Sequence, residues 1–239
     1  MRLLSRCRSR SAFSLCLILF GCHTPPPPVS EPKPAASTLA TNNVVRKPSD
    51  WKPLLDGKSL RGWAITDFAG GGEVKVSGDK VVVQMGDTLT GITWTNGPLP
   101  KTEYEISLEA MKIEGTDFFC ALTFPVGESF CTWVVGGWGG GIVGLSSIDG
   151  MDASENDTSK SLYFERNRWF QLRLLVHRDR ILAYIDEEKI IDATIQGRKV
   201  AMRPGEIYKS QPLGLCTYQT TAAVRNIRLR DAPSESEKN

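Results

Sequence analysis

Apolar and polar residues alternate with a period of two along much of the chain after Lys80. Between residues 103 and 110, Tyr104, Ile106, Leu108 and Ala110 occupy the even positions, whereas glutamate or serine occupies the odd ones. Successive side chains of a β-strand point to opposite faces of a sheet, so this alternation predicts a strand with one buried face.

Short strands and turn signals continue to the end of this region. We predict one hairpin from residues 118–124 and 130–135 around a Pro-Val-Gly turn, and a second from residues 169–177 and 180–186. Further strands are expected at residues 190–193, 213–218 and 224–229. Turn signals recur about every 8–12 residues and no apolar stripe of helical period is sustained, which indicates an all-β, antiparallel sandwich or jelly roll.

The amino terminus has the pattern of an export signal. Several arginines precede an apolar run from Ala12 to Phe20, which is too short for a stable span of the roughly 20 residues that a bilayer requires. The run ends in Leu19-Phe20-Gly21-Cys22, which resembles the bacterial lipobox. We therefore predict a signal peptide over residues 1–21 and lipidation of Cys22; the alternative is an ordinary secretory signal with a chance cysteine.

The next segment differs sharply in composition from the rest of the chain. Residues 22–48 contain four consecutive prolines, further prolines, and serine, alanine and threonine, a composition typical of an extended spacer. A docking motif for an aromatic groove is the alternative reading. We expect a single domain over residues 49–230 and a disordered tail over residues 231–239.

Charge excludes one class of partner. The predicted signal contains four arginines and no acid, so its removal leaves 25 basic against 27 acidic residues. A mature chain of slightly negative net charge has no electrostatic footprint for nucleic acid.

Three cysteines fall in the domain: Cys120, Cys131 and Cys216. An odd number cannot be paired completely within the chain. Cys120 and Cys131 flank the first predicted hairpin turn, so they are either a cross-strand disulfide or buried thiols. Because His177 is the domain's only histidine, a zinc site of the usual ligands is not expected.

Gly139, Gly141 and Gly144 match the G-x-G-x-x-G pattern of dinucleotide-binding loops. That chemistry requires the loop to open a helix inside a βαβ unit, and neither is predicted around it. The pattern therefore favours a close approach of two chain segments or a bulge beside a site, and no nucleotide is expected.

The segment from Trp138 to Asn156 is the strongest candidate site in the pattern. It places an aromatic residue among glycines ahead of Asp149, Asp152 and Glu155. A sugar pocket commonly combines an apolar face with a few fixed polar groups. Oxygen ligands at this density are also compatible with a divalent cation such as Ca²⁺, and a solvated loop stabilised by turn residues is the third reading.

Other acids are weaker candidates. Asp117 precedes an apolar strand, where burial would raise the pKa of its carboxyl group towards that of a general base, although it is equally compatible with a turn. Glu109 and Arg173 lie on outward faces of predicted strands and line either a groove or a solvated sheet face.

Several segments together resemble a known bacterial family. They are residues 51–63 (Trp-Lys-Pro-Leu-Leu-Asp-Gly-Lys-Ser-Leu-Arg-Gly-Trp), 167–169 (Asn-Arg-Trp), 183–186 (Ala-Tyr-Ile-Asp), 189–192 (Lys-Ile-Ile-Asp), 212–215 (Pro-Leu-Gly-Leu) and 225–230 (Arg-Asn-Ile-Arg-Leu-Arg). The family is that of the 3-keto-disaccharide hydrolase domain, and the resemblance extends from Trp51 to Arg230. Among its members the chain is similar to exported lipoproteins of planctomycete-like bacteria.

The resemblance implies a concanavalin A-like jelly roll and chemistry on sugars oxidised at C3. A 3-ketone acidifies the C2 proton, so a general base can remove it and the glycosidic oxygen can leave from C1. Where many members have a His-Gly pair near the end, this chain has Tyr218 and Gln219, so the histidine's role does not carry over.

We therefore predict a hydrolase or lyase of 3-keto-glycosides, with a non-catalytic, lectin-like lipoprotein as the alternative. The predicted catalytic residues are Asp117, Asp152 and Glu155. The predicted substrate-binding residues are Trp138, Asp149, Asn156, Glu109, Arg173, Tyr218 and Gln219. The expected partners are an oxidised glycoside or other carbohydrate and, through the lipid anchor alone, the outer membrane or another periplasm-facing membrane.

Overall fold

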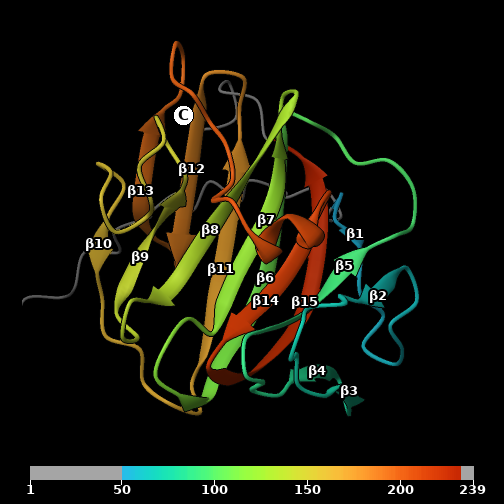
Figure 1. Cartoon of the computed structure of the whole chain (residues 1–239). Helices are drawn as coiled ribbons and strands as arrows, with labels where there is room; N and C mark the ends of the chain where they lie inside the picture. The colour runs from blue at the N-terminus through green and yellow to red at the C-terminus, as the bar shows by residue number, and fades with distance from the viewer. Residues whose placement is uncertain (1–49, 233–239) are drawn as a thin grey trace, which may run out of the picture. The chain divides into compact units, whose positions relative to one another are not determined.

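A computed structural model of the chain describes residues 50–232 (Figure 1). The predicted signal peptide, Cys22 and the proline-rich spacer lie outside the described residues, as do residues 233–239 of the predicted tail. No helix within residues 50–232 is long and apolar enough to cross a membrane.

Two antiparallel sheets make up the domain (Figure 1). One has eight strands in the order β13-β12-β11-β6-β15-β4-β3, with β1 paired to β15. Its strands are β1 (Lys52–Pro53), β3 (Val74–Ser77), β4 (Lys80–Val83), β6 (Tyr104–Gly115), β11 (Trp169–Val176), β12 (Arg180–Ile185), β13 (Glu188–Thr194) and β15 (Thr220–Asp231).

The other sheet has seven strands in the order β10-β9-β8-β7-β14-β5-β2. They are β2 (Trp63–Ile65), β5 (Leu89–Trp94), β7 (Cys120–Val126), β8 (Ser129–Gly137), β9 (Ile142–Ser146), β10 (Lys160–Ser161) and β14 (Gly214–Tyr218). A short 3₁₀ helix, η1 (Glu206–Ser210), precedes β14. The predicted all-β antiparallel sandwich and both predicted hairpins are confirmed.

The core fills the space between the two sheets. Tyr104, Ile106 and Leu108 are almost completely buried, as the alternation predicts, and Trp133 and Phe124 are fully buried among them. Burial of each such side chain contributes about 1.5–3 kcal/mol relative to leaving it in water. The one polar atom of Tyr104 is satisfied, because its hydroxyl donates a 2.6 Å hydrogen bond to the Pro125 carbonyl.

The domain's three cysteines are buried thiols. In the β7–β8 hairpin, Cys120 is opposite Val135 and Cys131 is opposite Phe124. The two cysteines are therefore not paired across the hairpin. This register excludes the cross-strand disulfide and leaves buried thiols.

The charged residues on the outward face of the eight-stranded sheet suggest a solvated surface, but part of this face is buried. Glu105 is fully buried, because Arg173 and Arg230 both bind its carboxylate. Arg173 also stacks on Tyr184 and Arg230 on Trp51, with guanidinium carbons 3.9 Å and 4.4 Å from the ring centroids. The long arginine side chains, held by aromatic rings, cover the acid and exclude water from it.

The seven-stranded sheet also buries both of its faces. All seven residues of β7 are buried, although only alternate ones contact the space between the sheets. A small second cluster covers the outward face and contains Phe68, Ala121 and Cys216, with Leu89, Phe118 and Ile207 packed against it. This face, opposite the main core, holds the candidate site.

Candidate functional site

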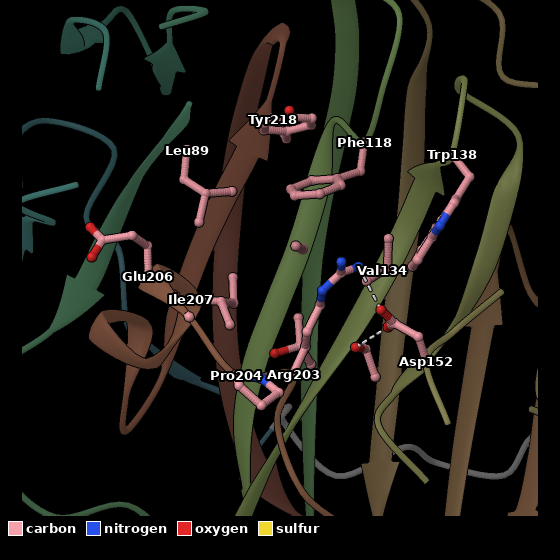
Figure 2. A pocket seen from close by; sticks show the side chains of 14 residues that line it. Leu89, Phe118, Val134, Trp138, Asp152, Arg203, Pro204, Glu206, Ile207 and Tyr218 are labelled. Carbon is pink, nitrogen blue, oxygen red and sulfur yellow. Dashed lines mark hydrogen bonds and ion pairs between the residues drawn. The ribbon is translucent and has the colours of Figure 1, made fainter. Parts of the chain in front are cut away.

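A groove lies on the outward face of the seven-stranded sheet, with a volume of about 330 Å³ (Figure 2). Its floor consists of short side chains from three neighbouring strands: Ala121 on β7, Thr132 and Val134 on β8, and Ser146 on β9. Cross-strand register places Ala121 opposite Val134 and Thr132 opposite Ser146. Short side chains on adjacent strands leave a hollow that larger groups at the rim enclose.

Aromatic side chains form one side of this groove (Figure 2). Phe118 and Tyr218 stack with ring centroids 5.8 Å apart. Trp138, in the turn between β8 and β9, is 42% exposed and has a positive φ of 49°. The arrangement provides apolar ring faces with a polar hydroxyl and indole N–H at their edges, which suits a ligand that is part apolar and part polar.

The segment between β9 and β10 positions Asp152, and buried Asn156 holds that segment in place. The Asn156 side-chain amide donates hydrogen bonds to the carbonyls of Leu145, Met151 and Asp152 at 2.7, 3.1 and 2.8 Å, and its oxygen accepts from the Thr158 backbone N–H at 2.9 Å. Asn156 is therefore a positioning residue whose polar groups are used within the protein.

A close approach of two chain segments fixes the same loop against the sheet. A Cβ atom on Gly144 would lie 2.6 Å from the Ala153 carbonyl oxygen, so only glycine fits there without displacing the loop. The last glycine of the G-x-G-x-x-G pattern thus serves a backbone contact, as expected in place of nucleotide binding.

Asp152 is the central polar group of the groove. One carboxylate oxygen accepts hydrogen bonds from the Ser146 hydroxyl and, at 2.8 Å, from the Ala153 N–H. The other oxygen accepts from the Arg203 guanidinium at 2.6 Å. The Asp152 side chain is 16% exposed and that of Arg203 is 63% exposed, so a well-held carboxylate faces a cation with room to move.

A second pocket of about 290 Å³ adjoins the first. The two pockets share the residues Trp138, Asp152, Arg203 and Pro204. Polar residues complete the second pocket, among them Ser147, Ser154 and Glu155. The Asp152–Arg203 pair consequently lies at the junction of a largely apolar groove and a polar pocket.

Glu206 at the start of η1 adds a second acid to the rim of the groove. Its carboxylate accepts hydrogen bonds from the Lys209 amine at 2.7 Å and from the Ala69 N–H at 3.3 Å. The lysine contact, followed by the backbone contact, lowers the pKa of Glu206, so this group stays ionised.

The structure brings four of the predicted site residues to these pockets. Trp138, Asp152 and Tyr218 line the larger groove, and Glu155 lines the smaller pocket. Asn156 lies below them, within the loop.

Asp117 and Gln219 adjoin Phe118 and Tyr218 in the sequence but do not line the groove. The Asp117 carboxylate accepts hydrogen bonds from the N–H groups of Phe118 at 2.8 Å and Gly139 at 3.2 Å, which connects the start of β7 to the β8–β9 turn. Gln219 is exposed, with a φ of 44°, at the reversal between β14 and β15.

Asp149, Glu109 and Arg173 are separated from the groove. Asp149 binds the Arg198 guanidinium at 2.8 Å and the Lys199 N–H at 2.8 Å, and these contacts lower the pKa of its carboxyl group. Glu109 and Arg173 are on strands of the other sheet, where Glu109 pairs with Arg225 and Arg173 with Glu105. A groove containing these last two does not form, because arginine stacking fills that sheet face.

The acidic side chains of this loop, which the sequence left compatible with a divalent cation, do not converge. Within residues 50–232 no group of three or more acidic, histidine or cysteine side chains is arranged to hold a metal ion. Asp149 and Asp152 are each paired with a different arginine. Calcium prefers six to eight converging oxygens, so the residues of this loop do not fit such a site.

Sequence patterns did not single out much of the groove. The lining residues outside the predicted site set are Leu89, Phe118, Ala121, Thr132, Val134, Ser146, Arg203, Pro204, Gly205, Glu206 and Ile207. Residues 142–146 belong to the candidate segment for which no strand was predicted, although they form β9. One available signal was the continuously apolar sequence of β7, which indicates a strand covered on both faces.

Comparison with known proteins agrees with this architecture. Crh5 transglycosylase in complex with NAG is 14% identical with a TM-score of 0.52, over 77% of this chain and 85% of that one. SCLam, a non-specific endo-β-1,3(4)-glucanase from family GH16, is 10% identical with a TM-score of 0.50, over 76% of this chain and 91% of that one. At such identities the likeness shows the fold, which is the predicted jelly-roll sandwich.

A family model described as the 3-keto-alpha-glucoside-1,2-lyase-like domain matches residues 50–230. No curated protein matches the chain. The match begins one residue before Trp51 and ends at Arg230, and it confirms the family predicted from the sequence motifs. Since it covers the whole sandwich, the chain belongs to the 3-keto-alpha-glucoside-1,2-lyase-like domain family, and its function is carbohydrate-related.

Proposed function

We propose that the domain cleaves the glycosidic bond of 3-keto-glycosides in the groove on the seven-stranded sheet. The observation that carries the proposal is the position of Asp152 and Arg203 at the junction of two adjoining pockets. A disaccharide placed across the junction would have one ring in each pocket and its linking oxygen above the Asp152 carboxylate. Family membership supports the substrate class.

In the proposed reaction Asp152 is the general base. Its carboxylate removes the proton from C2 of the oxidised ring, and the electron pair of the C–H bond forms an enolate with the C3 ketone. The enolate then reforms the ketone, creates a C1–C2 double bond and breaks the bond from C1 to the glycosidic oxygen. The proton held by Asp152 passes to that departing oxygen, and addition of water across C1–C2 completes the hydrolysis.

Arg203 and Ser146 support this chemistry in different ways. The Ser146 hydroxyl donates to the Asp152 carboxylate and orients it. Arg203 is the group that can stabilise the enolate oxygen, because its exposed guanidinium can move from Asp152 to the ligand as negative charge develops. Glu155 lines the second pocket, and in the proposed reaction its carboxylate accepts a proton from the water that adds to C1.

The test is turnover of 3-keto-trehalose and related 3-keto-glycosides by Asp152→Asn and by the wild type. Loss of the base should lower kcat by about 10²- to 10⁴-fold. The amide retains an oxygen to accept from Ser146 and the Ala153 N–H, so the thermal unfolding midpoint should change little. Asp157→Asn is the matched control, since Asp157 is exposed, pairs with Arg198 and lines neither pocket.

Unchanged turnover in Asp152→Asn would reject Asp152 as the base. Equal turnover of unoxidised trehalose by the wild type would reject the 3-keto substrate class, because elimination requires the acidified C2 proton. Inclusion of a chelator checks independently that no metal ion contributes to the rate.

A second candidate function is sugar binding without catalysis. It is favoured by the exposed ring of Trp138 beside Phe118 and Tyr218, and by the fact that Asp152 and Glu206 are already ion-paired. Binding of 3-keto- and unoxidised glycosides with similar affinity, and no turnover of any of them, would establish this alternative.

We also propose that the protein acts at the bacterial envelope, anchored by lipid at Cys22. The support is the sequence Leu19-Phe20-Gly21-Cys22 and the proline-rich spacer that follows it. Two or more acyl chains anchor a protein stably, so the wild type should sediment with membranes and Cys22→Ala should be released. Equal membrane association of both proteins would contradict lipidation.

A further inference from the structure

A pocket at the end of the sandwich lies apart from the groove and contains a buried, unpaired lysine. The pocket has a volume of about 710 Å³, and the β8–β9 turn and the connection from β10 to β11 form most of its walls. Lys112, in β6, lines it and is only 6% exposed. Among the described residues, the Lys112 amine has no hydrogen-bond or ion-pair partner.

The stem of Lys112 is buried, and its ammonium group lines the pocket without a counter-charge from residues 50–232 in contact with it. Burial, reinforced by repulsion from Arg166, lowers the pKa of Lys112, and attraction to Asp117 acts in the opposite direction. Asp117 makes no hydrogen bond or ion pair with the amine; its carboxylate accepts from two backbone N–H groups. A bound anion would supply the missing partner.

The glycine turn lies directly over this amine. A Cβ atom on Gly140 would be 2.9 Å from the Lys112 Nζ atom, so a side chain there would occupy the space beside the charge. The Gly140 and Gly141 N–H groups both donate to the Gly137 carbonyl and are not available to a ligand. The positively charged side chains that line the pocket are those of Lys112 and Arg166, and Glu165 is the acidic one.

Arg166 and Tyr163 offer further contacts to a ligand in this pocket. The only hydrogen bond of the Arg166 side chain among residues 50–232 is a long one, 3.5 Å, to the Gly115 carbonyl, so its guanidinium can turn to a ligand. Tyr163 is 88% exposed and offers a ring face with a hydroxyl at its edge. The pocket is larger than a bare inorganic anion needs, and its remaining lining includes the small residues Thr116 and Ser161.

We propose that this pocket binds an acidic sugar, with Lys112 and Arg166 contacting its anionic group and Tyr163 contacting the ring. The site is separate from the reaction assigned to the groove, since the β8–β9 turn presents Trp138 to the groove and Gly139–Gly141 to this pocket. The domain would then hold an acidic glycan at one place and process a glycoside at another.

Titration calorimetry of the full chain, purified in detergent, tests the proposal with glucuronate, glucose 6-phosphate, glucose and inorganic phosphate as probes. At least one acidic sugar should bind, more tightly than glucose or phosphate. Lys112→Met keeps the apolar stem and removes the charge, and should weaken binding about 10- to 100-fold. Arg166→Gln, on an exposed side chain, should weaken it without any risk to folding.

Two control variants separate this site from the rest of the molecule. Lys160→Met removes a nearby exposed lysine that does not line the pocket, and Asp152→Asn alters the groove. Both should bind the acidic sugar as the wild type does, whether or not the groove is catalytic. The proposal is overturned by unchanged binding in Lys112→Met and Arg166→Gln, by lost binding in Asp152→Asn, by equal binding of glucose or phosphate, or by no binding of either acidic sugar.

Discussion

The Arg203 guanidinium donates a 2.6 Å hydrogen bond to the Asp152 carboxylate, and the two residues are 51 positions apart in the chain. Asp152 comes from the loop between β9 and β10, whereas Arg203 belongs to the segment that leads into η1. Figure 2 shows the two side chains in contact, and both residues also line the adjoining second pocket. If Arg203 stabilises developing charge, its removal affects the reaction far more than the fold.

Arg203→Met should lower kcat by about 100-fold, the size of effect seen when one group that stabilises a transition-state anion is lost. The free energy of unfolding should fall by less than about 1 kcal/mol, because the Arg203 side chain is 63% exposed and Asp152 keeps its hydrogen bonds from Ser146 and Ala153. Steady-state kinetics and denaturant unfolding measure the two quantities. Arg61→Met, at an exposed site outside the pockets, is the control, and an equal loss of kcat in both variants would contradict a specific role.

Trp138→Ala should weaken sugar binding about tenfold, because a large ring at the junction of both pockets is removed. Its indole is 42% exposed, so little core packing is lost and the unfolding midpoint should stay nearly constant. Binding can be followed by calorimetry. Tyr208→Ala, at another exposed aromatic residue that lines neither pocket, should bind as the wild type does; a similar weakening there would indicate a non-specific effect.

Glu105→Gln should destabilise the domain by about 2 kcal/mol. The substitution leaves Arg173 and Arg230 without their shared, fully buried counter-charge. The cost is below that of a fully buried broken pair, because both arginines are about a third exposed and water screens their charge. Urea unfolding gives the change. Glu128→Gln, which removes the exposed partner of Lys101, should cost less than about 0.5 kcal/mol.

Activity provides the second readout for Glu105→Gln. Glu105 is on the sheet that does not form the groove, so kcat and KM of the folded variant should equal those of the wild type. A loss of activity without loss of stability would show that this arginine-covered face contributes to the site.

Cys120, Cys131 and Cys216 should resist alkylation by maleimide at pH 8 in the folded protein and react rapidly once it is unfolded. Burial raises the pKa of the Cys131 and Cys216 thiols to about 12 and also raises the pKa of the Cys120 thiol, so almost no thiolate is present. Peptide mapping after alkylation identifies the modified residues. A rate for any of them equal to that of a free cysteine would contradict the burial.

The same thiols make stability depend on alkaline pH. The unfolded chain loses these protons from about pH 8.5, whereas the folded chain retains them to about pH 12. Below the unfolded pKa their contribution is fully present, and it is lost as the pH rises towards the folded pKa. Unfolding free energies measured from pH 8 to pH 11 should therefore decline, and Cys216→Ala should decline less steeply than the wild type.

Sequence patterns predicted the strands reliably where one face is polar. The alternation over residues 103–110 predicted the inward face of β6. Its four residues, Tyr104, Ile106, Leu108 and Ala110, are all buried. The pattern was less informative in β7, where both faces are apolar, and in residues 142–146, where glycine and serine masked β9. Glu105 was misleading for a related reason, because a charge on an outward face is buried when neighbouring arginines cover it.

The sequence by itself determined the all-β class, the family, and the segment that contains Trp138 and Asp152. Those depend on local alternation and on contiguous motifs, which a linear chain displays directly. Only the tertiary structure decided that Asp152 faces Arg203, that Glu109 and Arg173 belong to the opposite sheet, and that Lys112 ends unpaired below Gly140. These relationships depend on which distant strands pair and in which register, and the energy that selects the pairing is spread over the packing of two whole sheets.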